Sequence, residues 1–372
     1  MVRRILAASL FALCIVAASS ADGLLRLTFL GDIMAHVNNT RMQDFHDIYA
    51  DVRELLVGDD LTLANLEFSV DQTSPVAGYP AFNAHRDYLE AAIDSGVQVF
   101  STANNHSLDL WEDGIYQTLR SFERLGKRPG STVAFSGLRG NPLAPFRPVE
   151  IDCKGVRIGF LAATQFVNYW IDSPYVNIVD YNDPAAAQAF LDAVRSEAPR
   201  FDLFIVSYHG DEEYMLAPSR RKRDFFHKLV ENGAHIVFGH HPHVLQEYER
   251  VPDPSGDRLI MYSMGNFISG QTWKLGPADW GSEEAWKGDS MLLSVDVSLT
   301  GGKAGVQGVE PTLISNYRNS RGELVVGKLE RLAEGSPDLG PAWTMYYRKR
   351  LDIVRAFLSG SLKAASGLAR RP

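Results

Sequence analysis

Six short apolar runs, each ending abruptly in small polar residues, constrain the fold of this chain more than any other feature of its sequence. The runs are Leu25–Leu30, Leu61–Ala64, Val97–Ser101, Phe201–Ser207, His235–Phe238 and Leu259–Ser263. Uninterrupted apolar runs of this length are typical of strands covered on both faces of a sheet. They therefore predict sheet structure buried between other layers.

Segments with helical periodicity separate these runs. They are Gln43–Val57, Arg86–Asp94, Glu112–Leu125, Ala185–Ser196 and Arg220–Asn232. Two further runs, Val149–Ile151 and Val156–Leu161, predict a hairpin, and Met291–Val297 predicts a late strand. Because strands and helices alternate, the fold class is α/β. We expect two packed mixed β-sheets flanked by helices rather than one parallel sheet.

The first residues have the pattern of a secretory signal peptide. Arg3 and Arg4 precede an apolar run over Ile5–Ala18, and small residues follow as far as Ala21. This pattern predicts export to the periplasm or the cell surface, with cleavage after Ala21. An uncleaved membrane anchor is the alternative, although the run is short for a bilayer span.

Charge and cysteine content narrow the partners and the metal chemistry. The formal net charge of the chain is −8, and it becomes −10 once the two arginines of the signal peptide are removed. An acidic chain argues against nucleic acid as the default partner. Cys153 is the one cysteine after the signal peptide, which excludes an internal disulfide and a thiolate zinc cluster. Any metal site must therefore use His, Asp, Glu and Asn.

The character of the sequence changes from about Arg318. The final segment carries an apolar stripe at helical spacing, formed by Trp343, Tyr347, Leu351, Val354, Leu358 and Leu362. Basic residues dominate after Gly340. The stripe can dock on the protein's own core, which we favour, or lie on an anionic membrane surface. We divide the chain into a signal peptide (1–21), a core domain (22–317) and a basic helical tail (318–372).

Polar clusters follow the apolar runs directly. The clusters are Gly31-Asp32, Asn65-Leu66-Glu67, Asn104-Asn105-His106 with Asp109, His209 to Glu213, His240-His241-Pro242-His243 and Gly265-Asn266. Five of the ten histidines lie in them. In open α/β sheets, ligands bind beyond the carboxyl ends of the strands. Parallel neighbouring strands would therefore bring these clusters together.

Imidazole, carboxylate and amide groups form a ligand set suited to Mn, Fe, Zn or Mg. Two such ions about 3.5 to 4 Å apart would polarise a phosphoryl or carbonyl oxygen and activate water near neutral pH. A bridging carboxylate would be needed to hold them so close, and Asp32 and Glu67 are the candidates. The sequence thus predicts a site for divalent metal ions, with two as the expected number.

The ordered motifs resemble those of the capsule synthesis protein CapA family, over roughly Leu25–Ile268. They are Gly31-Asp32, Asn65-Leu66-Glu67, Ala103 to Asp109, His209 with Glu213-Tyr214, Gly239 to Gln246 and Tyr262 to Phe267. That family is associated with poly-γ-glutamate capsule production and belongs to the calcineurin-like metallophosphoesterase superfamily. The resemblance implies a four-layer sandwich, with two packed sheets and helices outside.

The resemblance also implies roles for single residues. The metal ligands would be Asp32, Glu67, Asn105, His209, His241 and His243. His106 would stand beside the metals and hydrogen-bond a substrate oxygen or protonate the leaving group. Asp109 would orient the His106 ring.

Two features depart from the wider superfamily. Its first motif is usually Asp-x-His, whereas Ile33 and Met34 follow Asp32 here and the nearest histidine is His36. The last motif is ambiguous because His240 competes with His241 for a ligand position. We favour His241 with His243, since their His-x-His spacing matches the related pattern.

The leading functional expectation is an exported CapA-like protein whose metal site handles a phosphate ester or an anionic capsule polymer such as poly-γ-glutamate. The alternatives are a non-hydrolytic, polymer-binding accessory of a membrane synthesis complex, and an exported phosphodiesterase or nucleotidase. The basic run Ser219–Arg223 is the first candidate for an anion-binding patch, against the alternative of a solvated helix face. Trp273, Trp280 and Trp286 either contact substrate or anchor a loop.

Overall fold

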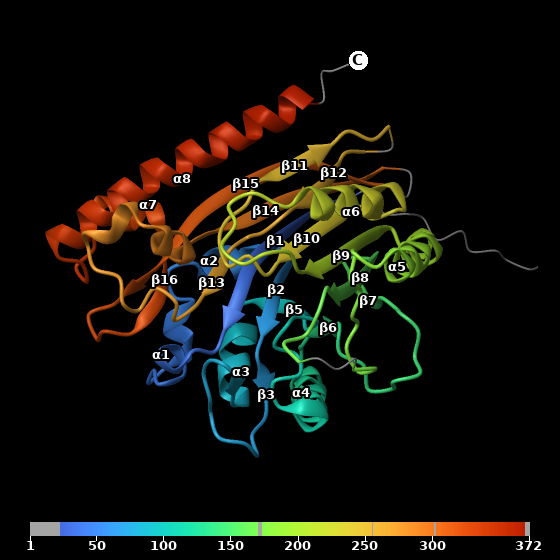
Figure 1. Ribbon diagram of the computed structural model, residues 1–372, viewed down its shortest axis with the longest axis horizontal. Helices are drawn as coiled ribbons and strands as arrows, with labels where there is room; N and C mark the ends of the chain where they lie inside the picture. The colour runs from blue at the N-terminus through green and yellow to red at the C-terminus, as the bar shows by residue number, and fades with distance from the viewer. Residues whose placement is uncertain (1–22, 170–172, 255, 301–302, 369–372) are drawn as a thin grey trace, which may run out of the picture.

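The computed structural model describes residues 23–169, 173–254, 256–300 and 303–368, without the side chains of residues 303 and 361–368. The predicted signal peptide lies outside these residues. Two β-sheets pack together, and helices lie outside them (Figure 1). The predicted α/β class with two packed mixed sheets is therefore confirmed.

The first sheet has the strand order β16-β15-β14-β1-β2-β5-β6, with β13 also beside β1. Its strands are β1 (Gly23–Met34), β2 (Leu61–Glu67), β5 (Val97–Ser101), β6 (Ala134–Ser136), β13 (Asn266–Ile268), β14 (Asp289–Thr300), β15 (Lys303–Arg318) and β16 (Leu324–Lys328). The pairs β1–β2, β2–β5, β5–β6 and β1–β13 are parallel, and β14 to β16 add an antiparallel edge. A small parallel pair, β3 (Ser69–Val70) and β4 (Asn83–Ala84), lies apart from this sheet.

The second sheet has the order β11-β12-β10-β9-β8-β7. Its strands are β7 (Val149–Cys153), β8 (Val156–Thr164), β9 (Leu203–His209), β10 (Ile236–His240), β11 (Tyr248–Val251) and β12 (Arg258–Met261). The central strands β8, β9, β10 and β12 are parallel, whereas β7 and β11 are antiparallel edges. The predicted hairpin is β7–β8.

Burial on both faces explains the uninterrupted apolar runs. Along β9, Ile205 joins the large central core, whereas Phe204 and Val206 join a second core on the other face. Phe29 of β1 and Phe238 of β10 pack edge to face across the two sheets, with ring centroids 5.0 Å apart. A strand covered on both faces needs apolar residues at every position, so the alternation of apolar and polar residues that is typical of half-exposed strands disappears.

Four helices cover the sheets near their predicted positions. They are α3 (Arg86–Asp94), α4 (Trp111–Gly126), α5 (Pro184–Glu197) and α6 (Arg220–Glu231). Side-chain caps fix two of the starts: Asp183 accepts from the amides at the start of α5, and Ser219 accepts from Lys222 N. The shorter helices are α1 (Val37–Thr40), η1 (Phe45–Ile48), α2 (Arg53–Gly58), η2 (Ala198–Arg200), η3 (Asp279–Gly281) and η4 (Glu283–Gly288).

The single helix predicted over Gln43–Val57 is wrong, because η1 and α2 divide this segment. Asp44 caps η1 by accepting from His46 N, which starts a short 3₁₀ turn. The link between the two helices is held by the C-terminal part of the chain: Asp51 accepts from Lys328 N at 2.6 Å and pairs with Arg331 at 2.8 Å. This tertiary contact overrides the local helical pattern.

The segment after residue 318 packs with the core. β16 extends the first sheet, and α7 (Leu329–Glu334) and α8 (Pro341–Leu368) follow it. In α8, Tyr347, Leu351, Val354 and Leu358 are buried in the same core cluster as the first sheet. The apolar stripe therefore docks on the protein itself along the residues whose side chains are described. Among the described helices, none combines the length and hydrophobicity needed to span a membrane.

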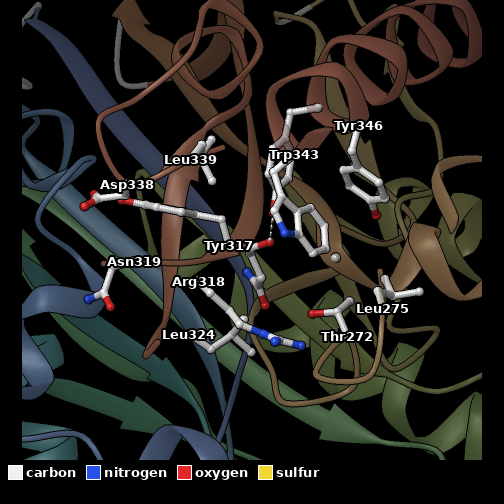
Figure 2. Close-up of a pocket in the computed structure, with 13 residues that line it drawn as sticks. Thr272, Leu275, Tyr317, Arg318, Asn319, Leu324, Asp338, Leu339, Trp343 and Tyr346 are labelled. Atoms are coloured by element: carbon white, nitrogen blue, oxygen red, sulfur yellow. Dashed lines mark hydrogen bonds between the residues drawn. The ribbon is translucent and has the colours of Figure 1, made fainter. Parts of the chain in front are cut away.

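A cavity of about 170 Å³ lies where the start of α8 meets β15 and β16 (Figure 2). Trp343 and Tyr346 of α8 line one part of it, and Tyr317 and Arg318 of β15 line another. The Arg318 guanidinium lies over the Trp273 ring, 4.6 Å from its centroid. None of the predicted metal ligands lines this cavity.

A buried ion pair fastens α8 to the first sheet. Arg350 and Asp289 are 1% and 0% exposed, and two guanidinium nitrogens lie 2.6 and 2.8 Å from Asp289 Oδ2. Arg350 also donates to the Trp280 carbonyl at 2.8 Å, and Ser315 donates to Asp289 Oδ1 at 3.0 Å. The pair is thus hydrogen-bonded on both sides, which a buried pair requires.

Removing one partner of the Arg350–Asp289 ion pair should leave the charge of the other partner buried and unpaired. We expect Asp289→Asn to lower the free energy of unfolding by about 3 to 5 kcal/mol, measured by urea denaturation at pH 7. Arg355→Gln, which breaks the exposed Arg355–Glu330 pair, should cost less than about 1 kcal/mol. Equal losses in the two variants would contradict this assignment.

His235, just before β10, should make the fold acid-sensitive. Its Nδ1 accepts from Phe204 N at 3.0 Å, and burial together with the nearby Arg258 charge lowers its pKa to about 3. The unfolded chain takes up this proton near pH 6.5, so stability falls as the pH drops from 6.5 towards 3, by at most about 1.4 kcal/mol per pH unit. His235→Asn should flatten that part of the pH profile; an unchanged slope would disprove the prediction.

Candidate metal centre

The carboxyl ends of strands from both sheets meet at one place. In the first sheet, Asp32 of β1 is in register with Asn65 of β2 and Asn266 of β13. In the second sheet, His240 of β10 is in register with His209 of β9. The polar clusters that follow the apolar runs therefore converge, because parallel strands end at the same edge.

Contacts among the predicted ligands are short. His243 lies 3.2 Å from Asp32 and 3.5 Å from Glu67. His209 lies 3.7 Å from Glu67, and its Nε2 is 3.1 Å from His241 Nδ1 and 2.8 Å from Asn105 Oδ1. The structure thus brings all six predicted ligands into one cluster: Asp32, Glu67, Asn105, His209, His241 and His243. Their role in binding metal stays a prediction.

Two buried groupings have the geometry to hold an ion. One is Glu67, His209 and His241, and the other is Asp32, Glu67 and His243; within each, the ligand atoms lie within 4.8 Å of one another. Glu67 belongs to both, as a bridging carboxylate would. A third grouping adds the exposed Glu213 to His241 and His243. Glu213 was not among the predicted ligands.

The chemistry of the cluster fits a cation. Asp32 Oδ2 and Glu67 Oε1 are buried and receive no hydrogen bond among the described residues. Burial and the neighbouring histidines lower the pKa of His209 and of His241 well below the usual value, so both rings are neutral and offer lone pairs. Burial and the nearby Asp32 charge raise the pKa of Glu67. Acceptors crowded around a buried space are stabilised by a bound cation.

Asn65 supports the two carboxylates, a role that was not predicted from the sequence. Its Nδ2 donates to Asp32 at 2.8 Å and to Glu67 at 3.0 Å. Asn104 in turn donates to Asn65 Oδ1 at 3.3 Å and to the Leu66 carbonyl at 2.7 Å. The signal was present in the spacing: Asn65 lies two residues before Glu67 on β2, so both point to the same face.

His240 and His36, the two histidines that the motifs left in doubt, lie outside the groupings that could hold a metal ion. His240 Nδ1 lies 3.2 Å from Asp32 Oδ1, whereas His243 approaches the other carboxylate oxygen, and the His240 ring packs on Phe238. His240 is in none of the three groupings, whereas His241 is in two. His36 is likewise in none of them, and its ring packs against Phe82.

His106 lies beside the cluster and is oriented by Asp109. His106 is buried, and its Nδ1 is 2.7 Å from Asp109 Oδ2, which also accepts from Phe82 N at 2.6 Å. The Phe82 ring packs on the imidazole with centroids 4.6 Å apart. Asn168 Nδ2 lies 3.3 Å from His106 Nδ1, and Asn105 Nδ2 donates to Asn168 Oδ1 at 3.1 Å, contacts that the sequence did not predict. His106 is thus held in place next to a predicted ligand.

Backbone strain is concentrated around this cluster. Among the described residues, six non-glycine residues have positive φ. Five of them lie at this edge: Asp211, Tyr214, His241 and His243 in loops, and Trp111 as the first residue of α4. The sixth, Lys154, lies in the β7–β8 turn. Such conformations cost of order 1 to 3 kcal/mol each and persist where the surrounding structure enforces them. His241 and His243 are therefore placed by a strained turn.

Gly31 allows the close packing that positions Asp32. A Cβ at residue 31 would lie 1.9 Å from the Gly265 carbonyl oxygen. Asp32 N donates to that same oxygen at 2.9 Å. Only glycine lets β1 approach the loop before β13 so closely.

The basic run Ser219–Arg223 is engaged within the protein. Arg220 pairs with Asp224, Arg221 donates to Asn182, Lys222 donates to Gly210, and Arg223 pairs with Glu247. These partners leave no cluster of uncompensated surface charge in the run. Of the four side chains, Lys222 alone is buried.

The three tryptophans of the late loop pack against the C-terminal segment. Trp273 lies under Arg318, Trp280 lies under Lys349, and Trp286 packs on Phe357. Their contacts match the loop-anchor alternative. Other aromatic side chains lie nearer the cluster: the Tyr214 ring is 6.3 Å from the His243 ring, and Trp111 packs on Tyr169 at 4.7 Å.

Similar proteins have names that refer to capsule, PGA or polyglutamine synthesis. The chain is 28% identical over 261 residues to the capsule biosynthesis protein CapA of Bacillus anthracis, covering 67% of this chain and 61% of that protein. It is 24% identical over 269 residues to the PGA biosynthesis protein CapA of Bacillus subtilis, covering 68% and 65%. The chain thus aligns with less than two thirds of either relative. A probable polyglutamine synthesis accessory protein of Mycobacterium tuberculosis is 25% identical over 228 residues, covering 56% of this chain and 55% of that protein.

Solved structures show weaker similarity. A hypothetical protein from Thermus thermophilus has a TM-score of 0.45 and 17% identity, covering 78% of this chain and 98% of that one. A calcineurin-like phosphoesterase from Bacillus subtilis has a TM-score of 0.41 and 11% identity, covering 90% and 99%.

The family comparison covers the part of the chain that forms the cluster. The sequence pattern of the bacterial capsule synthesis protein family PGA_cap matches residues 26–271. This span contains the predicted ligands and His106. The resemblance inferred from the motifs over Leu25–Ile268 is therefore confirmed, and the chain belongs to the bacterial capsule synthesis protein family PGA_cap.

Proposed function

We propose that this chain is an exported protein of capsule or poly-γ-glutamate biosynthesis with a metal-dependent, phosphoesterase-like active site. Family membership supports the biosynthetic role, and the N-terminal pattern over residues 1–21 supports export. The observation that carries the proposed chemistry is a pair of buried carboxylate oxygens, on Asp32 and Glu67. They lie beside neutral histidines and receive no hydrogen bond from the part of the chain that the structure describes.

Asp32, Glu67, Asn105, His209, His241 and His243 would hold the metal. A divalent cation bound there supplies Lewis acidity towards a phosphoryl oxygen. Asn65 keeps the two carboxylates in place through its amide hydrogens. The substrate in this proposal is a phosphate ester or an anionic capsule polymer.

His106 acts as the general acid in this proposal. Asp109 accepts a hydrogen bond from His106 Nδ1–H and so fixes the ring with Nε2 directed away from the carboxylate. In its protonated form, His106 gives the Nε2 proton to the leaving oxygen, and Asp109 stabilises the imidazolium beforehand. The burial of Asp109 and its second bond from Phe82 N keep this orientation rigid.

Metal binding should stabilise the protein and depend on the cluster. At a Mn²⁺ concentration 100 times Kd, metal-stripped protein should gain about 2.7 kcal/mol in the free energy of unfolding. Asp32→Ala and His241→Ala should lose most of this gain, whereas His46→Ala, which alters an exposed ring, should keep it. Calorimetric titration and denaturation with and without Mn²⁺ measure the effect. Similar gains in all four proteins would place the cation elsewhere.

Hydrolysis of a simple phosphodiester such as bis(p-nitrophenyl) phosphate should require His106. His106→Ala should lower kcat by about 10² to 10⁴ while leaving Mn²⁺ affinity within about twofold, because the residue transfers a proton and binds no metal. Asp109→Asn should lower kcat and alter its pH profile. Steady-state kinetics on the metal-loaded protein measure both.

The alternative is a non-hydrolytic accessory that binds polymer. It requires a metal-loaded wild type with no phosphodiesterase activity, together with poly-γ-glutamate binding that survives Asp32→Ala and His241→Ala. That combination of results would refute the enzymatic proposal and keep the biosynthetic one.

A further inference from the structure

Lys222 is a buried lysine without an ionic partner among the described residues. Its side chain is 0% exposed, and its Nζ donates one hydrogen bond, to the Gly210 carbonyl at 3.2 Å. The ring of Phe226 covers it, with the centroid 5.5 Å away. Fully buried lysines are rare unless they are paired, because removing an ammonium from water is costly.

The position of Lys222 on α6 is one that packing alone would give to an apolar residue. The buried residues of this helix are Lys222, Phe225, Phe226 and Leu229, at the spacing of a core-facing stripe. Lys228, on the same helix, is exposed in the ordinary way. Phe225, Phe226 and Leu229 belong to the second core, and of the buried residues of α6 only Lys222 carries a charge.

The ammonium contacts a residue next to the candidate metal centre. Gly210 follows the predicted ligand His209, and the Lys222 charge adds to the effect of burial in lowering the pKa of His240 and His241. Burial lowers the pKa of Lys222 itself to about 8, against the charges of Asp211 and Asp32, which favour the ammonium form. The side chain is therefore mainly charged at pH 7.

The charge balance around the cluster gives this lysine a function. As metal ligands, Asp32 and Glu67 would carry two negative charges, and Lys222 would offset one of them without occupying a ligand position. With one divalent cation bound, the set would carry a net charge of +1 with Lys222 and zero without it. In a buried, low-dielectric site, a fixed positive charge opposes cation binding and favours an anionic substrate group.

We propose that Lys222 is an internal counter-charge to the ligand carboxylates, which weakens divalent cation binding and keeps the site positive towards an anionic substrate. This inference rests on the metal site of the proposed function. Lys222 is a positioning residue in the electrostatic sense, because it acts through the cluster and is itself neither a metal ligand nor in contact with substrate.

The test is the Mn²⁺ affinity of the metal-stripped, full mature chain at pH 7, measured by calorimetric titration. Lys222→Met should bind Mn²⁺ at least about tenfold more tightly than the wild type, because a buried charge acts strongly at short range. Lys228→Met removes the same charge from the exposed face of the same helix, so its affinity should change less than about twofold.

A structural role predicts the opposite result. If Lys222 served only to hold the Gly210 carbonyl, its loss would disorder the turn after His209 and weaken Mn²⁺ binding. Lys222→Gln, which retains a hydrogen-bond donor without the charge, should also bind Mn²⁺ more tightly, and it decides the matter where Lys222→Met folds poorly. If the wild type binds Mn²⁺ and the two Lys222 variants bind it equally well or more weakly, the counter-charge proposal is overturned while the metal site stands. Absence of binding in every protein overturns the metal site and this proposal together.

Discussion

The structure depends on a place where two sheets bring uncompensated acceptors together. Asp32 and Glu67 lie on neighbouring parallel strands, and His209, His241 and His243 reach them from the other sheet. Two of the carboxylate oxygens receive no hydrogen bond among the described residues, which costs free energy in a buried site. Apolar packing on both faces of the sheets holds these groups in position despite that cost. The strained turn at His241 and His243 is a further cost borne at the same place.

The sequence predicted the buried strands well because burial on both faces leaves an unmistakable apolar run. It also placed α3 at its observed bounds, since the periodicity of Arg86–Asp94 is undisturbed by neighbours. Prediction failed where a distant segment decides the local structure. The break between η1 and α2 depends on Asp51 binding Lys328 and Arg331, and no local pattern contains that information.

The same distinction applies to the site. Its ligand candidates could be found because each follows a strand, and the parallel order of strands then brings them together. Asn65 could have been found from its two-residue spacing to Glu67. Lys222 could not, because it stands in a run of four basic residues that is typical of a charged helix face. Its burial depends on the direction of α6 over the second sheet, which tertiary packing determines.

The C-terminal segment also bears on the site, although it lies outside the family match. β1, which carries Asp32, pairs along one side with β14. One strand next to this carboxylate's own strand therefore lies beyond residue 271, where the family match ends. Asn266 Oδ1 is 3.0 Å from His243 Nδ1, and its Nδ2 donates to the Lys287 carbonyl at 3.0 Å, two residues before Asp289. Arg350 of α8 anchors Asp289 in turn. A continuous series of contacts therefore runs from the C-terminal helix to a predicted metal ligand. The segment after residue 318 is accordingly part of the framework that orients His243, because the buried ion pair at the start of β14 helps to fix Lys287, whose carbonyl holds the Asn266 side chain that contacts His243.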